Sequence, residues 1–192
     1  MFSQEAPPIP VEVFIGQKSG IYQIFVSRKF EPGGKLGLLN IINYEAMYDS
    51  EEENRYFIQS VLGYDLSKRF LIGAGARLTA FGFKPLIALN YGYFGPKVNL
   101  VLQPSYELHS EGAVSLFTVF EWRPEPDIKL LPYFRIQGLT GNNGGHTFSY
   151  HYWRVGVRVK NWRFGPAANF QYIGPDAEAR SNFGGFLGVL IK

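Results

Sequence analysis

The chain of 192 residues has no cysteine, few charged residues and no long apolar run. The lack of cysteine excludes disulfides and thiolate metal sites. Charged residues make up only 18% of the chain, whereas about 25% is usual in soluble domains. No stretch approaches the roughly 20 consecutive apolar residues that a membrane-spanning helix needs. These absences exclude a disulfide-stabilised scaffold and a helical membrane protein.

A concentrated excess of basic residues is also lacking. The formal net charge is only +3, and Arg and Lys are interleaved with Glu and Gln along the same segments. Nucleic-acid-binding domains instead gather their basic residues on one face. We therefore expect no nucleic-acid partner.

The chain is rich in aromatic residues, which take part in a two-residue alternation. Aromatic residues make up 17% of the chain, with 17 Phe and 12 Tyr. Between residues 152 and 160, Trp153, Val155, Val157 and Val159 alternate with Tyr152, Arg154, Gly156, Arg158 and Lys160. Successive side chains of a strand point to opposite faces of a sheet. The pattern predicts a strand with one apolar face and one polar, charged face.

Similar segments recur along nearly the whole chain and predict about twelve strands. The predicted ranges are 11–17, 20–30, 35–48, 55–66, 70–81, 84–94, 98–108, 113–122, 128–139, 150–160, 162–172 and 183–191. An even number suits bacterial single-chain barrels, and ten is the alternative if the first segments are not strands. Residues 1–10, with three prolines, are expected to form an extended lead-in to a single barrel domain over residues 11–192.

The connections between these segments fall into two alternating sets. One set is tight and rich in Pro, Gly and Lys: 31–34, 67–69, 95–97, 124–127 and 160–162. The other is longer and more acidic or glycine-rich: 49–54, 109–112, 140–149 and 174–182. Outer-membrane barrels have short turns on the periplasmic side and longer loops outside. We therefore expect the tight turns and both termini on the periplasmic side.

The two faces of the predicted strands differ consistently in polarity. Ile72, Leu89, Leu100, Phe120 and Phe164 represent the apolar face, and Tyr and Trp lie towards strand ends, as in the aromatic girdles of membrane barrels. The other face carries Arg, Gln, Asn and Gly. A soluble barrel would have its apolar residues inside. The sequence thus predicts an all-β fold, a closed antiparallel up-and-down transmembrane barrel with a polar lumen.

Three segments resemble bacterial outer-membrane β-barrel proteins, in particular small barrels of Bacteroidetes type. They are Val13-Phe14-Ile15-Gly16-Gln17-Lys18, Trp162-Arg163-Phe164-Gly165-Pro166-Ala167-Ala168-Asn169-Phe170 and Phe183-Gly184-Gly185-Phe186-Leu187-Gly188. The resemblance implies a location in the bacterial outer membrane and contact with the lipid bilayer and lipopolysaccharide. Other outer-membrane proteins are possible partners. The segments carry no catalytic motif.

The charged residues of the predicted lumen suggest two functions. They are Arg77, Glu107, Glu121, Arg135, Arg154, Arg158 and Arg163, with Glu45 elsewhere on the ring. Facing acidic and basic walls would create a transverse field, which favours a small porin-like channel for polar or anionic solutes. The same charges could instead pair and fill a narrow barrel. The protein would then be a plugged structural or accessory subunit of a larger outer-membrane complex.

A lipid hydrolase is the third hypothesis. Known outer-membrane lipid hydrolases place Ser beside His on a strand, and this chain has Ser149 near His151 and His109 beside Ser110. No third orienting residue is evident for either pair, so we predict no catalytic residue and no enzyme. His146 and His151, and the acidic run 49–53, lack the spacing of metal sites. We predict no metal or other cofactor.

Overall fold

The computed structural model describes residues 8–80, 82–109, 112–124 and 130–191, and within them the chain forms a closed antiparallel barrel. Its twelve strands are β1 (Ile9–Gly16), β2 (Ser19–Lys29), β3 (Leu36–Met47), β4 (Arg55–Asp65), β5 (Phe70–Thr79), β6 (Gly82–Phe94), β7 (Val98–Glu107), β8 (Ala113–Trp122), β9 (Leu131–Asn142), β10 (His146–Val159), β11 (Trp162–Ile173) and β12 (Glu178–Ile191). A short 3₁₀ helix, η1 (Glu51–Glu53), lies between β3 and β4. The predicted fold class and the strand count of twelve are confirmed.

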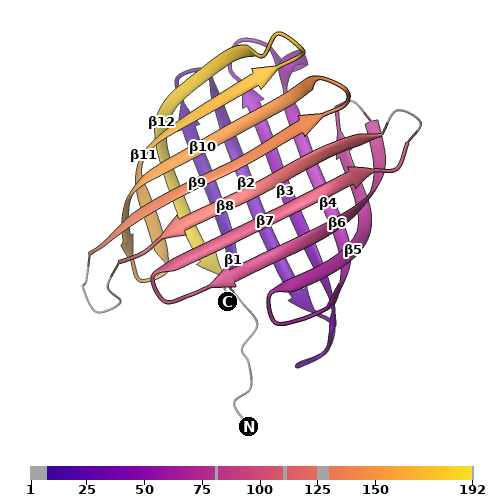
Figure 1. The fold of residues 1–192 in the computed structure, drawn as a ribbon. Helices are drawn as coiled ribbons and strands as arrows, with labels where there is room; N and C mark the ends of the chain where they lie inside the picture. Colours follow the sequence, from indigo (N-terminus) through magenta and orange to yellow (C-terminus); the bar gives the residue numbers. More distant parts are fainter. Residues whose placement is uncertain (1–7, 81, 110–111, 125–129, 192) are drawn as a thin grey trace.

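Each strand pairs with the next along the chain, and β1 closes the ring by pairing with β12. The closing register sets Ile9 opposite Ile191 and Gly16 opposite Gly184. The start of β1 and the end of β12 therefore lie at one end of the barrel (Figure 1), which we call the terminal end. The other end is called the opposite end. No sheet edge is left unpaired between the first and last strands, which removes the site where edge-to-edge aggregation begins.

The connections alternate between the two ends, but the predicted difference in their lengths is wrong. The gap from Lys29 to Leu36, at the terminal end, is longer than the gap from Asn142 to His146 at the opposite end. Two predicted loops are also partly strand, because β9 continues to Asn142 and β12 begins at Glu178. Backbone pairing continues through these polar segments because ladder hydrogen bonds do not need an apolar side chain.

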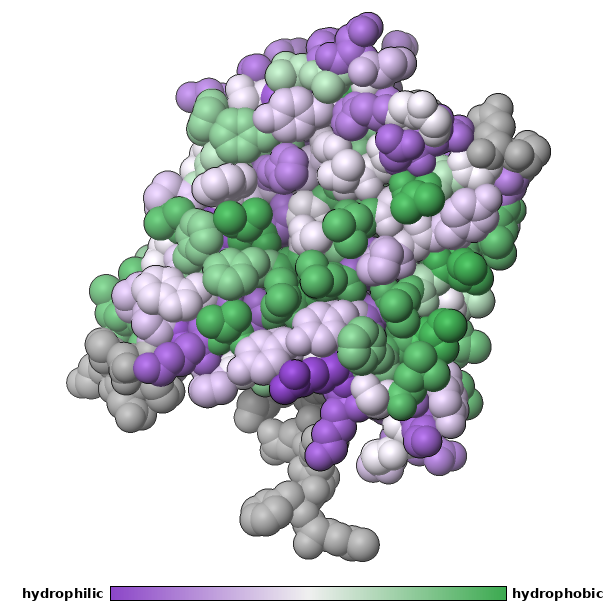
Figure 2. Space-filling model, viewed as in Figure 1, coloured by the Kyte–Doolittle hydropathy of each residue, from purple (hydrophilic) through white to green (hydrophobic). Residues whose placement is uncertain are grey.

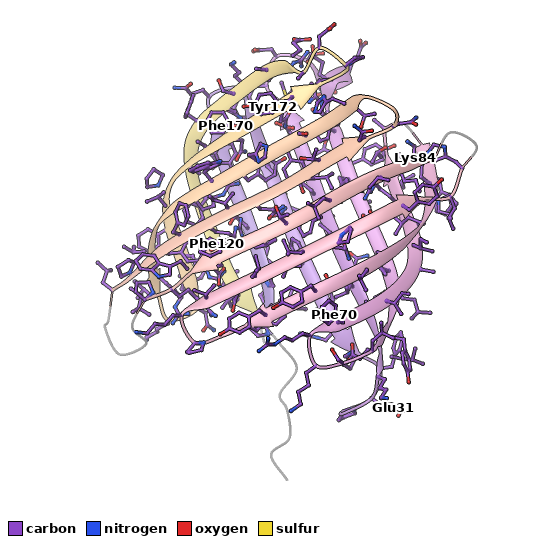
Figure 3. All side chains as sticks on the ribbon, viewed as in Figure 1. Glu31, Phe70, Lys84, Phe120, Phe170 and Tyr172 are labelled. Atoms are coloured by element: carbon purple, nitrogen blue, oxygen red, sulfur yellow. The ribbon has the colours of Figure 1, made fainter. Side chains whose placement is uncertain are left out.

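The outer wall carries the apolar face, as the alternation predicts. Ile72, Phe120, Val155 and Phe164 are exposed, and Phe70, Phe120, Phe170 and Tyr172 stand on the outside of the ribbon (Figure 3). Apolar residues gather across the middle of the wall, and the two ends are hydrophilic (Figure 2). An exposed apolar band around a closed barrel matches the hydrocarbon layer of a bilayer. Among the described residues, no helix is long and apolar enough to cross a membrane.

The inner wall is less polar than predicted. Besides the expected Arg, Gln and Asn, it carries a buried apolar cluster. Its members are Phe14, Ile21, Ile41, Phe117, Tyr133, Leu139, Tyr150, Tyr152, Ala167 and Phe186. Val61, Leu86 and Ala88 form a second small cluster. The lumen of this narrow barrel is therefore packed in part like a protein core, because twelve strands leave an interior that large side chains can fill.

Candidate functional site

The seven charged residues predicted for the lumen all lie on the inner wall. Arg77 comes from β5, Glu107 from β7, Glu121 from β8, Arg135 from β9, Arg154 and Arg158 from β10, and Arg163 from β11. All but Arg158 are buried, and Arg158 is half-buried. Buried charges are costly unless they are paired. The way in which each one is paired therefore decides what the lumen can do.

Four of the five arginines form two directly opposed pairs of like charge. Arg154 on β10 lies opposite Arg135 on β9. Towards the terminal end, Arg158 on β10 lies opposite Arg163 on β11. Like charges directly opposite on neighbouring strands are destabilising. Each pair needs a compensating anion.

The first pair is compensated by Glu12, a residue of β1 that the sequence reasoning did not single out. One oxygen of Glu12 accepts from Arg154 Nε at 2.7 Å, and the other accepts from Arg135 Nη2 at 2.7 Å. The carboxylate thus bridges both guanidinium groups. We call Glu12, Arg135 and Arg154 the Glu12 layer.

Arg154 has further partners that hold it in place. Its Nη1 donates to Asn169 Oδ1 at 2.7 Å. The guanidinium carbon lies 5.0 Å from the centre of the Phe14 ring and 5.8 Å from that of Phe186. Cation–π contacts of this kind are stronger away from water, and Arg154 is only 1% exposed. These contacts therefore hold the side chains of the Glu12 layer in fixed positions inside the barrel.

The second pair is compensated only in part, by Glu121 of β8. Arg163 Nη1 donates to Glu121 Oε2 at 2.8 Å, and Arg123 Nε lies 3.2 Å from Glu121 Oε1. The Arg123 contact is an ion pair without hydrogen-bond geometry, because that Nε has no hydrogen-bond acceptor. Arg158 forms no ion pair within the described part of the chain. We call Glu121, Arg123, Arg158 and Arg163 the Glu121 layer.

A third group of charges lies nearer the opposite end. Arg77 Nη1 donates to Glu107 Oε1 at 2.7 Å, while Nε and Nη2 donate to Gln59 Oε1. Lys84 Nζ lies 3.1 Å from the second oxygen of Glu107. Nη2 of Arg77 also donates to the Ser115 hydroxyl at 2.9 Å. Arg77 and Glu107 therefore satisfy each other and brace β4, β5, β7 and β8.

A cavity of about 400 Å³ opens at the opposite end. Its lining includes Lys18, Glu45, Arg55 and Gln171. Gln171 joins two of these charges, since it accepts from Arg55 Nη1 at 2.6 Å and donates to Glu45 Oε2 at 2.7 Å. The cavity is thus a polar vestibule of mixed charge above the packed interior.

Side chains from facing walls meet between the vestibule and the terminal end. Phe25 of β2 and Phe117 of β8 lie on diametrically opposed strands, with their ring centres 5.5 Å apart. Asn43 of β3 donates to the hydroxyl of Tyr152 on β10 at 3.3 Å. Together with the bridges from Glu12 to β9 and β10, these contacts cross the middle of the lumen.

Ser149 contacts His146 rather than His151, the histidine that the sequence places two residues away from it. The distance between Ser149 Oγ and His146 Nε2 is 2.9 Å, while His151 packs against the Tyr172 ring. His146 Nδ1 lies 2.6 Å from the Gly174 carbonyl oxygen, which can only accept, so Nδ1 carries the proton. Ser149 is 5% exposed. The contact between His146 and Gly174 joins the start of β10 to the connection between β11 and β12. Ser110, of the second predicted pair, lies outside the described residues.

Two functional residues were missed for different reasons. Glu12 stands in the alternating segment Val11-Glu12-Val13-Phe14, so its inward parity could have been read from the sequence. Its role could not, because its partner Arg154 is 142 positions away. Arg123 follows the last residue of β8, where the alternation no longer assigns a face.

No family model matches the chain, and no curated protein matches it. Solved structures of similar fold are known. The KdgM porin aligns over 96% of this chain and 98% of its own, with a TM-score of 0.50 and 12% identity. The NanC porin aligns over 97% of this chain and 100% of its own, with a TM-score of 0.53 and 10% identity. At such identity the likeness shows the fold alone: this chain is a closed twelve-stranded β-barrel, similar in fold to these two porins.

Proposed function

We propose that the protein is a bacterial outer-membrane barrel that passes small anionic, polar solutes through a lumen closed at rest by its own side chains. The carrying observation is the imbalance of charge on the inner wall. Among the described residues, Arg77, Arg123, Arg135, Arg154, Arg158 and Arg163 face three acids in the same networks, namely Glu12, Glu107 and Glu121. A cationic wall attracts anions and repels cations. The apolar outer band and the porin-like fold support the membrane location.

Closure follows from the contacts between facing walls. An anion that enters the vestibule meets both the pair of Phe25 with Phe117 and the Glu12 layer on its way to the terminal end. Passage therefore requires that the two rings part and that a solute anion replaces the Glu12 carboxylate beside Arg135 or Arg154. Such an exchange keeps each guanidinium paired, which avoids the cost of an isolated buried charge.

Planar-bilayer recording tests the proposal. The native barrel is expected to be closed most of the time, with brief openings that are selective for chloride over potassium. The double variant Phe25→Ala, Phe117→Ala removes the facing rings and is expected to conduct steadily with the same selectivity. Phe120→Ala, which removes an aromatic ring from the outer face of the same strand β8, is the matched control and should leave the closed state unchanged.

The closed interior also favours a second candidate function. A barrel that stays silent both in its native form and in the double variant would refute the channel and support a structural or accessory subunit of an outer-membrane complex. Other outer-membrane proteins would then be its partners, besides the bilayer and lipopolysaccharide. Cross-linking in intact outer membranes, followed by identification of the linked proteins, separates this role from that of an isolated channel.

Lipid hydrolysis is the third and weakest candidate. The contact between Ser149 and His146 has the spacing of a nucleophile and its base, but the serine is buried and lacks a third side chain to orient the histidine. Incubation with outer-membrane lipids is expected to leave them intact. Lipid turnover that Ser149→Ala abolishes would overturn this expectation.

A further inference from the structure

The Glu121 carboxylate is held by neighbours other than Arg158. Its Oε1 accepts from Asn99 Nδ2 at 3.1 Å and faces Arg123 Nε at 3.2 Å. Its Oε2 accepts from Arg163 Nη1 at 2.8 Å and from the Tyr133 hydroxyl at 3.0 Å. A carboxylate has about four lone-pair sites. Asn99, Tyr133 and Arg163 take three of them and Arg123 faces the carboxylate as an ion pair, so this one carboxylate already serves two arginines and forms no ion pair with Arg158.

Arg158 is a cation with two like charges near it. It lies directly opposite Arg163, and Arg123 and Arg163 repel it, whereas Glu121 attracts it without forming an ion pair. Its Nε is buried and has no hydrogen-bond partner, and the same holds for Nε of Arg163, a residue that is 7% exposed. Buried donors are normally satisfied. Nε of Arg123 and Nε of Arg135 are also unsatisfied, but Arg135 is paired with Glu12, whereas Arg158 has no ion pair among the described residues. Arg158 therefore lacks both an acceptor and a counter-charge.

The charges of the Glu121 layer indicate what charge the missing acceptor must carry. Arg123, Arg158 and Arg163 contribute three positive charges and Glu121 one negative charge, which leaves an excess of two. Phosphate carries about −1.5 to −2 charges near pH 7 and presents several strong acceptor oxygens. Guanidinium groups match such oxygens with paired N–H donors. A phosphate dianion therefore fits both the charge and the donors.

The place of the cluster makes it accessible from one side of the membrane. Arg158 and Arg163 flank the turn at residues 160–161, and Arg123 directly follows β8, so all three lie at the terminal end of the lumen. Arg158 is half-buried, so part of its side chain is open to solvent. Lys160, in the same turn, is exposed and adds positive charge there.

We infer that Arg123, Arg158 and Arg163 form a binding site for a phosphate group at the terminal end of the lumen. The ligand is either inorganic phosphate or the phosphate group of a small organic solute, since both offer the same oxygens. The site gives the proposed anion-passing lumen its substrate class and rests on that proposal for its role in transport. Binding itself does not require an open lumen.

Titration calorimetry of the full chain in detergent micelles tests the site. Sodium phosphate, added at constant ionic strength, is expected to bind one per chain, and sulfate to compete, whereas chloride should not. Arg158→Gln is expected to weaken phosphate binding at least tenfold, and Arg158→Lys, which keeps the charge but not the planar fork, to weaken it less. Arg180→Gln, which removes an exposed arginine at the opposite end, should bind phosphate as the native chain does.

Several outcomes would overturn the site. Equal phosphate binding by native and Arg158→Gln chains, or no binding above the chloride control, refutes it. Circular dichroism of each variant excludes the trivial explanation of a lost fold, and Arg158 has no ion pair whose loss would unfold the barrel. Glycerol 3-phosphate distinguishes the two sources: tighter binding than inorganic phosphate identifies an organic phosphate, and weaker binding identifies the free ion.

The phosphate site and the proposed channel can be refuted independently of each other. A barrel that binds phosphate but never conducts would refute the proposed channel and leave the site standing. A barrel that conducts anions but shows no phosphate binding would refute the site and leave the channel. Conduction of chloride that phosphate blocks in the native chain, but not in Arg158→Gln, is expected when both hold.

Discussion

The Glu12 layer and the Glu121 layer begin from the same arrangement and end in opposite states. Each contains two arginines directly opposed on neighbouring strands. Glu12 crosses the lumen from β1 with both oxygens available, and it bonds both arginines of its pair. Glu121 is already held by neighbours from its own and adjoining strands, so it reaches Arg163 but not Arg158. The difference separates a charge cluster that holds the barrel together from one that is available to a ligand.

The largest expected effect comes from breaking the Glu12 layer. Glu12→Gln leaves Arg135 and Arg154 buried, opposed and without an anion. Removal of one partner of a buried ion pair costs about 3–5 kcal/mol, so the free energy of unfolding in micelles or bilayers should fall by about that amount. Urea unfolding followed by tryptophan fluorescence measures it. Glu178→Gln, at an exposed glutamate of β12, is the control and should be nearly neutral.

A loss of stability no larger than in the control would contradict the interpretation of the Glu12 layer as structural. It would indicate that water reaches Arg135 and Arg154 and replaces the carboxylate. The lumen would then be open at this level, and conductance of the native barrel should be continuous.

The next largest effect concerns the two faces of one strand, β10. On β10, Arg154 faces the lumen and its neighbour Val155 is 52% exposed on the outer wall. An arginine that faces lipid near the midplane costs about 2–4 kcal/mol, and near an interface only about 0–1 kcal/mol. Val155→Arg should therefore destabilise the barrel in bilayers more than Val157→Arg, which lies closer to the terminal end. Equal costs, or none, would show that this wall does not face lipid.

The contrast between the walls explains how much the sequence could predict. Alternation in segments such as 152–160 depends on neighbouring residues only, so it predicts the strands and the outward Val155 and Phe120 correctly. It also places Arg154 and Arg158 inside. It does not distinguish them, because their partners are set by closure of the barrel, which brings Glu12 to Arg154 across 142 positions. The inward Phe14 and Phe117 were missed because an apolar face was equated with lipid.

The smallest expected effect, that of Arg158→Gln, tests most directly whether the Glu121 layer differs from the Glu12 layer. Arg158→Gln removes a cation that lies opposite one arginine and near another, and that forms no ion pair within the described part of the chain. Opposed like charges cost roughly 0.2–1 kcal/mol, so in low salt without phosphate this variant should be more stable than the native chain by about that amount. The gain should shrink in about 1 M salt, where the Debye length is roughly 3 Å. Arg154→Gln, on the same strand, should destabilise under both conditions, because Arg154 is paired.

Unfolding measured at both salt concentrations, with and without phosphate, completes the test. Phosphate should stabilise the native chain and leave Arg158→Gln unchanged, because a ligand that binds the folded state adds to its stability. The native chain should therefore become more stable than Arg158→Gln once phosphate is present in excess. An Arg158→Gln chain that is less stable than the native one in the absence of phosphate would mean that Arg158 has an acidic partner after all, and the Glu121 layer would then be as complete as the Glu12 layer.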